Sequence, residues 1–226
     1  MVEELTRPTR GGCTAGRPTR AVLPPSSRVW LGPVAVLAAL VVVVLGVVYA
    51  GGSEPGGADA WIAVDGVGPP WRHVALTTDF LGEPVGAAVL VGAAVTGCLL
   101  VRWPRAAVLV VVGTGLAVGT TKLLKPLVGR TIHGDANLSY PSGHTAFLTA
   151  FALVVALLVT GRLGLGRTAG TSLVLAAALA AGGAMGWAQV VLGAHYPTDV
   201  LGGWCTALAV VPTTAWLVDA GRRKHF

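Results

Sequence analysis

Polar and ionisable residues gather in two segments of this sequence, 122–145 and 189–199, which interrupt long apolar stretches. The second segment holds His195 and Asp199, four residues apart. If a helix begins near Pro197, this spacing can bring the carboxylate beneath the imidazole. An aspartate that accepts from one ring nitrogen fixes the tautomer and leaves the other nitrogen free as a base or nucleophile. The alternative is that both residues only cap and solvate a helix start.

The first segment contains a sequence suited to binding an anion. Pro141-Ser142-Gly143-His144 directly precedes an apolar run, so Ser142 and Gly143 are expected at a helix N-terminus. Free backbone N–H groups, the serine hydroxyl and the positive end of the helix dipole attract anions there, and glycine permits close approach. We expect His144 to point from the first turn into the same space. The alternative makes Ser142 a plain N-cap and His144 an interfacial side chain.

Two cations accompany this helix start. Arg130 presents a planar fork suited to phosphate, and Lys125 acts as a point charge. Lys122 lies three residues deeper in the preceding apolar run, and we expect it to snorkel to the surface instead. Two histidines, an orienting aspartate and two cations predict phosphoryl transfer through a covalent histidine. Because the sequence has no metal-ligand spacing such as His-x-x-x-His, neither a metal nor another cofactor is expected.

The rest of the chain is strongly apolar. Hydrophobic residues make up 54% of the 226 residues and charged residues only 12%, whereas soluble domains carry about a quarter charged residues. This composition argues against a soluble enzyme, a disordered chain and a nucleic-acid-binding domain. Membrane-spanning helices need about 17–25 apolar residues. We therefore predict an all-α polytopic membrane protein, with six transmembrane helices near residues 29–50, 85–101, 106–124, 145–160, 171–192 and 200–218.

Basic residues predict the orientation of this bundle. Twelve of the sixteen Lys and Arg residues fall on one side of a six-pass path, which the positive-inside rule makes cytoplasmic. This topology puts both polar segments at the extracytoplasmic face and both termini in the cytoplasm. We predict a flexible basic tail over 1–28, the membrane domain over 29–219 and a basic tail over 220–226. The acidic loop 51–84 is expected to lie in the headgroup layer and gives no indication of chemistry.

The polar segments resemble the type 2 phosphatidic acid phosphatase (PAP2) family. Its three motifs run Lys-x6-Arg-Pro, then Pro-Ser-Gly-His, then Ser-Arg-x5-His-x3-Asp. The second motif is complete at 141–144, the end of the third is complete at 195–199, and the resemblance extends over roughly 59–218. It implies a PAP2-like helical bundle. It also implies His195 as nucleophile, Asp199 as its orienting partner and His144 as general acid, with a phosphate pocket formed by Lys125, Ser142 and Gly143.

Two arginines of the family pattern are replaced in this chain. Ile132 and His133 stand where Arg-Pro is expected, and Ala188 and Gln189 stand where Ser-Arg is expected. Our hypothesis is that Arg130 takes over the first missing guanidinium and that a protonated His133 assists it. Gln189 would donate a neutral hydrogen bond to the phosphate, or else make a contact between helices.

The resemblance implies a phosphoric-monoester or diphosphate hydrolase of the membrane. Its substrate would be a lipid phosphate or diphosphate, such as phosphatidic acid, phosphatidylglycerophosphate or a polyprenyl phosphate or diphosphate. The reaction would pass through a phosphohistidine at the extracytoplasmic face. The missing arginines leave open a catalytically weak member that binds or transports lipid phosphates or serves in assembly. The partners expected are the lipid substrate and the bilayer, not nucleic acid; no protein partner is indicated.

Overall fold

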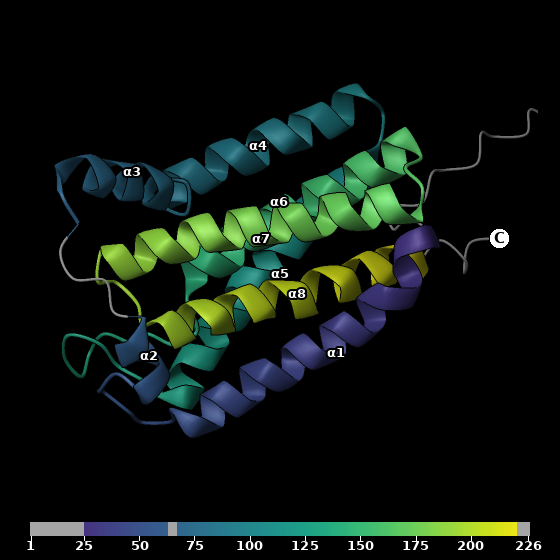
Figure 1. Cartoon of the computed structure of the whole chain (residues 1–226). Helices are drawn as coiled ribbons and strands as arrows, with labels where there is room; N and C mark the ends of the chain where they lie inside the picture. The colour runs from purple at the N-terminus through teal and green to yellow at the C-terminus, as the bar shows by residue number, and fades with distance from the viewer. Residues whose placement is uncertain (1–24, 63–66, 221–226) are drawn as a thin grey trace, which may run out of the picture.

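The computed structural model describes residues 25–62 and 67–220, and the regular elements within them are helices. Figure 1 shows the long helices running side by side, with α2 and α3 at one end of the bundle. The predicted tails lie outside the described residues except for 25–28 and 220, which belong to helices. In chain order the helices are α1 (Pro25–Val48), α2 (Gly57–Trp61), α3 (Pro69–Phe80), α4 (Pro84–Leu100), α5 (Pro104–Val128), α6 (Gly143–Leu163), α7 (Arg167–Val191) and α8 (Pro197–Ala220).

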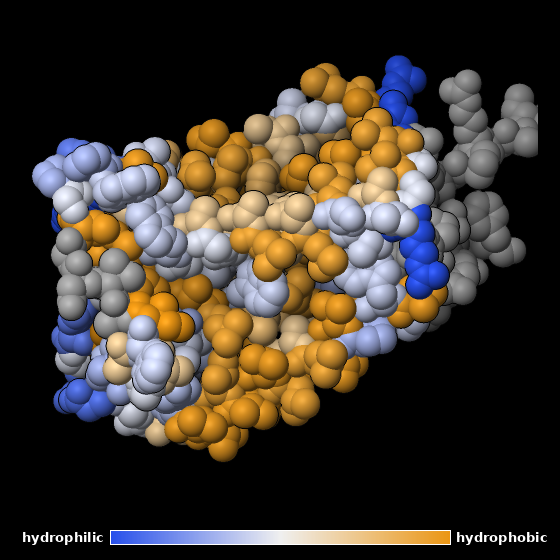
Figure 2. All heavy atoms as spheres, in the orientation of Figure 1, coloured by the Kyte–Doolittle hydropathy of each residue, from blue (hydrophilic) through white to orange (hydrophobic). Residues whose placement is uncertain are grey.

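Five of these helices, α1, α5, α6, α7 and α8, are each long and apolar enough to cross a membrane. The pair α3 and α4, which is bent by 58° at the break between the two helices, is a candidate for a sixth span. Figure 2 shows apolar side chains across the middle of the molecule and hydrophilic ones toward its ends. The chain is therefore a multi-pass membrane protein, as predicted. Helix α3 was not predicted from the sequence. Only short apolar segments of the loop 51–84 were assigned a place, and that place was the membrane interface.

The bend between α3 and α4 has a local cause. Pro84 occupies the first turn of α4, where its missing N–H costs no hydrogen bond and its ring prevents α3 from continuing. Gly86 packs so closely on the end of α3 that a Cβ there would collide with the carbonyl oxygen of Phe80. The chain consequently bends by 58° at residues 81–83 instead of continuing as one straight helix.

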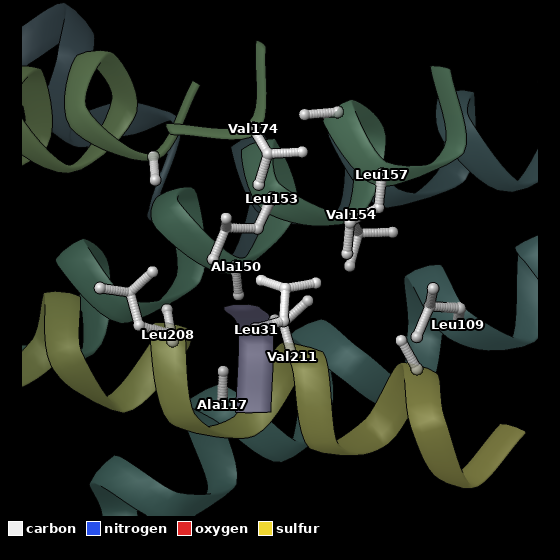
Figure 3. Close-up of a cluster of buried hydrophobic side chains, with 14 of the residues drawn as sticks. Leu31, Leu109, Ala117, Ala150, Leu153, Val154, Leu157, Val174, Leu208 and Val211 are labelled. Carbon is white, nitrogen blue, oxygen red and sulfur yellow. The ribbon is translucent and has the colours of Figure 1, made fainter. Parts of the chain in front are cut away.

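The main hydrophobic core lies between α5, α6 and α8, with α1 packed against α8. Figure 3 shows Leu109 of α5, Leu153 and Leu157 of α6 and Val211 of α8 directed toward one another. These four side chains are almost completely buried. In a bilayer, such close packing rather than water exclusion holds helices together. It fixes the relative positions of the helix ends that carry the polar segments.

A pair of glycines lets α8 approach the start of α6. A Cβ on Gly203 would collide with the carbonyl oxygen of Ser142, and one on Gly202 would collide with the ring of Tyr140. The Tyr140 hydroxyl in turn donates a 2.7 Å hydrogen bond to the carbonyl oxygen of Val42 on α1. Close backbone contact at small residues is the usual means of helix association in lipid. Here it brings the two polar segments of the sequence to one end of the bundle.

Candidate active site

The starts of α6 and α8 lie against each other. The backbone N–H of Ser142 donates a 3.0 Å hydrogen bond to the carbonyl oxygen of Asp199. Ser142 is the N-cap of α6, and its buried hydroxyl accepts a 3.4 Å hydrogen bond from the backbone N–H of Thr145. The hydroxyl is thus used inside the protein as a cap. The structure accordingly favours the alternative interpretation of Ser142 over a direct contact with phosphate.

His195 and Asp199 face each other across the first turn of α8. Nδ1 of His195 lies 3.7 Å from Oδ2 of Asp199, and this oxygen also accepts a hydrogen bond from the backbone N–H of Tyr196. Asp199 is completely buried, and the His195 side chain is only 9% exposed. Burial lowers the pKa of His195, and the neighbouring Asp199 offsets this effect only in part. The environment therefore favours the neutral imidazole, which is the form that can act as a nucleophile.

His144 and His195 line a single pocket of about 470 Å³. Lys125 and Gly143 also line it, so the structure brings together four of the residues selected from the sequence. Lys122 lines the pocket as well, although it was expected to lie apart from the site. The remaining lining residues are Gly82, Pro84, Ala87, Val118, Thr121 and Phe147.

Lys125 is held in place by the loop between α5 and α6. Its Nζ donates a 2.5 Å hydrogen bond to the carbonyl oxygen of Leu138, and the side chain is half-buried. Lys122, one turn earlier in α5, is exposed. The pocket therefore has one fixed cation and one cation that is free to move, both supplied by the same helix.

Arg130 occupies a different place from the one we predicted. Its guanidinium is completely buried and donates 2.7 Å hydrogen bonds to Oδ1 of Asp199 and to Oδ2 of Asp59, and a third to Thr198. The rings of Tyr49 and Tyr196 stack on it, with centroids 4.1 and 4.5 Å away. Arg130 does not line the pocket. The hypothesis that it replaces a phosphate-binding guanidinium is not supported, because both carboxylates already occupy it.

Asp59 is the second carboxylate of this buried ion cluster. Its role was not predicted from the sequence. It accepts from Arg130 and also from the backbone N–H of Thr198 at 2.8 Å. Burial alone would raise the pKa of Asp59, but the hydrogen bonds from Thr198, Arg130 and Gly56 together lower it. The carboxylate therefore stays charged beside Arg130. Asp59 acts on the site through Arg130 and Asp199, from a short helix 71 residues before the arginine.

The two other residues expected to assist phosphate binding are directed elsewhere. Nε2 of His133 lies 2.7 Å from the carbonyl oxygen of Gly193, on the exposed surface of the loops. Gln189 is buried, and its Nε2 donates a 2.5 Å hydrogen bond to Oδ1 of Asp79. Ile132, at the position of the family arginine, is buried. Among the residues that the structure describes, no arginine lines the pocket.

The turn between α3 and α4 reaches His144 from the side opposite α8. Nε2 of His144 lies 3.5 Å from Oε1 of Glu83 and 3.7 Å from Oδ1 of Asp79. These ligand atoms, all within 4.8 Å of one another, form a group that could hold a metal ion. They supply three donors, and Asp79 Oδ1 already accepts from Gln189. One feature of the sequence could have indicated this contact. Segment 51–84 carries several acidic residues, and the predicted topology puts it on the same face as the cationic site.

Comparisons with known proteins agree with this fold. The PAP2 superfamily profile matches residues 106–223, slightly more than half of the chain. The fold is similar to that of the first transmembrane PAP2 type phosphatidylglycerolphosphate phosphatase from Bacillus subtilis. The TM-score is 0.65 at 22% sequence identity, over 84% of this chain and 96% of that one. No curated protein sequence matches the chain.

Proposed function

The chain belongs to the PAP2 superfamily and has an all-helical membrane fold, and from this premise we propose that it hydrolyses a lipid phosphate or diphosphate. Both the family and the fold were predicted from the sequence and are confirmed. The observation that carries the proposal is the shared pocket of His144, His195 and Lys125. Phosphoryl transfer through a covalent histidine needs a nucleophile, a proton donor and a site that binds the phosphate. Two imidazoles beside one anion site can supply all three.

In the proposed reaction His195 is the nucleophile. Its neutral ring attacks phosphorus through the nitrogen that does not face Asp199, and the bond from phosphorus to the lipid oxygen breaks. His144 donates its proton to that leaving oxygen. Water then attacks the phosphohistidine and gives a proton to His144, so that inorganic phosphate leaves and both rings regain their starting states. The burial that lowers the pKa of His195 supports its part in this scheme.

Charge and helix geometry support phosphate binding in the same pocket. Lys125 and Lys122 supply two positive charges, and Gly143 is the first residue of α6, whose N-terminal backbone N–H groups attract anions. With no arginine on the pocket wall among the described residues, these lysines and N–H groups carry the charge stabilisation.

The apolar wall of the pocket supports a lipid substrate. Three apolar residues form this wall, each about one helical turn from another lining residue. Ala87 follows Pro84 in α4, Val118 precedes Lys122 in α5, and Phe147 follows His144 in α6. A substrate whose phosphate meets the histidines can place its hydrocarbon tail along this wall. Phosphatidic acid, phosphatidylglycerophosphate and polyprenyl phosphates or diphosphates all have the required shape and charge.

The distribution of basic residues supports an extracytoplasmic site. The helix ends opposite the pocket carry Arg102, Arg105, Arg162 and Arg167, and α1 begins and α8 ends on the same side (Figure 1). The positive-inside rule assigns that side to the cytoplasm. The pocket then faces the outer leaflet, and its substrate would come from there.

One observation favours a second candidate function. Arg130 is paired with buried carboxylates and Gln189 with Asp79, so neither supplies charge to a bound phosphate. A single donor that stabilises transition-state charge can be worth about 10²–10³ in rate. A protein lacking two such donors could bind or transport lipid phosphates, or serve in assembly, with little turnover.

The deciding experiment measures phosphate release in detergent from the lipids named above, with a chelator present. The protein is compared with a His195→Ala variant, and a radiolabelled phosphate is followed on the protein after rapid denaturation. Release and acid-labile labelling that both require His195 support the phosphatase. Tight binding of lipid phosphate without release supports the binding protein, and the absence of both contradicts the two candidates together.

A further inference from the structure

Residues 79–83, the end of α3 and the turn that leads into α4, lie against His144, the proposed general acid. The whole segment is called the turn between α3 and α4. It lies outside residues 106–223, to which the family match extends. We infer that this turn is a working part of the active site: it fixes the position of the His144 ring and places two carboxylates beside its Nε2. The inference rests on the proposed function, because it assigns His144 the task of protonating the leaving oxygen.

The steric part of the argument concerns Gly82. This residue lies against the face of the His144 ring, and a Cβ on Gly82 would collide with Cδ2 and approach Cγ to 2.9 Å. Both atoms belong to the ring, which is attached to the first turn of α6 by one short side chain. Any larger residue at position 82 must push the ring toward the pocket or out of it. Gly82 therefore defines the position of the imidazole.

The electrostatic part concerns the two carboxylates beside the ring. Nε2 of His144 is shielded from solvent and has no hydrogen-bond partner among the described residues. Its neighbours are the carboxylate oxygens of Glu83 at 3.5 Å and Asp79 at 3.7 Å. A proton on this nitrogen is attracted by both. The geometry is that of a proton donor held ready between its counter-ions and the substrate.

Gln189 gives this arrangement its particular character. It stands at the position of the motif arginine and donates to the same Asp79 oxygen that faces His144. An arginine there would neutralise Asp79 with a full positive charge. The amide of Gln189 orients Asp79 and leaves its negative charge available to His144. Position 189 thus holds a glutamine that acts on His144 through Asp79, in place of an arginine that would bind phosphate.

The turn is anchored firmly enough to serve as a positioning device. α3 packs along α7, where Trp71 meets Trp187 edge to face with ring centroids 6.2 Å apart. Gly86 fixes the bend at Phe80. The other ionisable groups that line the pocket with His144 are Lys122 and Lys125 from α5 and His195 from the loop before α8. The two lysines are positive, and the turn supplies the opposing negative charge.

A glycine substitution tests the steric claim. Gly82→Ala is compared with Gly92→Ala in α4, where an added Cβ meets nothing within 4 Å. General-acid catalysis contributes about 10²–10⁴-fold to rate. We expect Gly82→Ala to slow formation of the phosphohistidine from a lipid monophosphate at least about 30-fold in a single turnover. Formation of the phosphohistidine from p-nitrophenyl phosphate, whose phenolate leaves without a proton, should slow less than about threefold. Gly92→Ala should match the wild type on both substrates.

Isosteric removal of charge tests the electrostatic claim. In Asp79→Asn and Glu83→Gln, formation of the phosphohistidine from a lipid monophosphate should slow about tenfold or more, because the proton donor loses a neighbouring carboxylate, whereas formation from p-nitrophenyl phosphate should slow less than about threefold. The position of the ring is followed independently of turnover by NMR of histidine-labelled protein in micelles at one fixed pH, with His144→Gln identifying the signals. These signals should move in Gly82→Ala and stay in place in Gly92→Ala.

These readouts separate the inference from the proposed function. If the wild type releases no phosphate but the His144 signals move in Gly82→Ala and not in Gly92→Ala, the phosphatase proposal fails and the positioning role of the turn stands. If the wild type is active while Gly82→Ala, Asp79→Asn and Glu83→Gln all form the phosphohistidine from the lipid at the wild-type rate, the turn is only structural. Equal slowing with both substrates in Gly82→Ala would also contradict the positioning of a proton donor. Sensitivity of wild-type activity to chelator would assign the three residues to a metal instead.

Discussion

Arg130 donates a 2.7 Å hydrogen bond to Oδ1 of Asp199, the carboxylate whose other oxygen faces His195. The guanidinium that the sequence suggested for phosphate instead holds the orienting aspartate in place. Its second carboxylate, Asp59, sits at the same distance on the other side. The candidate nucleophile is therefore supported by a chain of buried charges that ends in α2.

Removing the charge of Arg130 should destabilise the protein strongly. Arg130→Met leaves Asp59 and Asp199 buried without a counter-ion, and breaking such a pair typically costs about 3–5 kcal/mol. Thermal unfolding in detergent should show a clearly lower midpoint. Adding Asp59→Asn to Arg130→Met should recover part of the loss, because one uncompensated charge disappears. A double variant that is less stable than Arg130→Met would contradict the ion cluster as described.

The acidic limb of activity should lie below the ordinary range of histidine. In the proposed reaction the neutral form of His195 is the nucleophile, and burial lowers its pKa. A lowered pKa keeps the ring neutral as pH falls, so kcat/KM should be retained below about pH 6.5, the usual histidine value, and decline at more acidic pH. The measurement is kcat/KM against pH with a soluble short-chain substrate. A half-maximal point above the usual value would oppose the assigned environment.

Restoring the motif arginine should not restore a phosphate contact. Gln189 faces Asp79, so the guanidinium of Gln189→Arg should pair with that carboxylate. We expect kcat to stay the same or fall, with the KM for lipid phosphate changed less than threefold. Gln189→Glu is the matched variant of opposite charge. A tenfold or greater rise in kcat/KM for Gln189→Arg would show that the side chain reaches the phosphate.

The close approach of α8 to α6 should depend on Gly203. Gly203→Ala places a Cβ against the carbonyl oxygen of Ser142, and overpacking of this kind costs about 1–3 kcal/mol. Unfolding temperature and activity should both fall, since the displaced helix start carries Asp199. Gly183→Ala in α7, where the added Cβ meets nothing within 4 Å, serves as the control. Equal behaviour of the two variants would argue against this contact.

The sequence predicted the parts of the site whose residues are linked by short spacing. His195 and Asp199 face each other because four residues make about one helical turn, and His144 and Gly143 follow an N-cap that the pattern made recognisable. Apolar run lengths predicted the membrane helices for the same reason, since each run is a local property. The chemical roles of these residues stay predictions until they are tested.

Contacts between distant segments could not be predicted in this way. The partner of Arg130 was assigned as phosphate because nothing local showed that Asp59 and Asp199 would reach it. Likewise, Asp79 and Glu83 meet His144 only because Gly86 bends the α3–α4 pair and α3 packs on α7. Charge type alone does not distinguish a ligand-binding arginine from one buried between carboxylates; the tertiary packing decides.

The ion cluster also bears on how the protein is made. Asp59 precedes Arg130 by 71 residues, and Asp199 follows it by 69. During synthesis Asp59 is already present when Arg130 emerges. Asp199 joins them only when the final helix enters the bilayer. Arg130 and Asp59 already balance each other in charge, so insertion of the final helix adds the second carboxylate and brings His195 and Asp199 to the site together. A nascent chain stopped before that helix would hold the Arg130–Asp59 pair but lack the carboxylate that faces the candidate nucleophile.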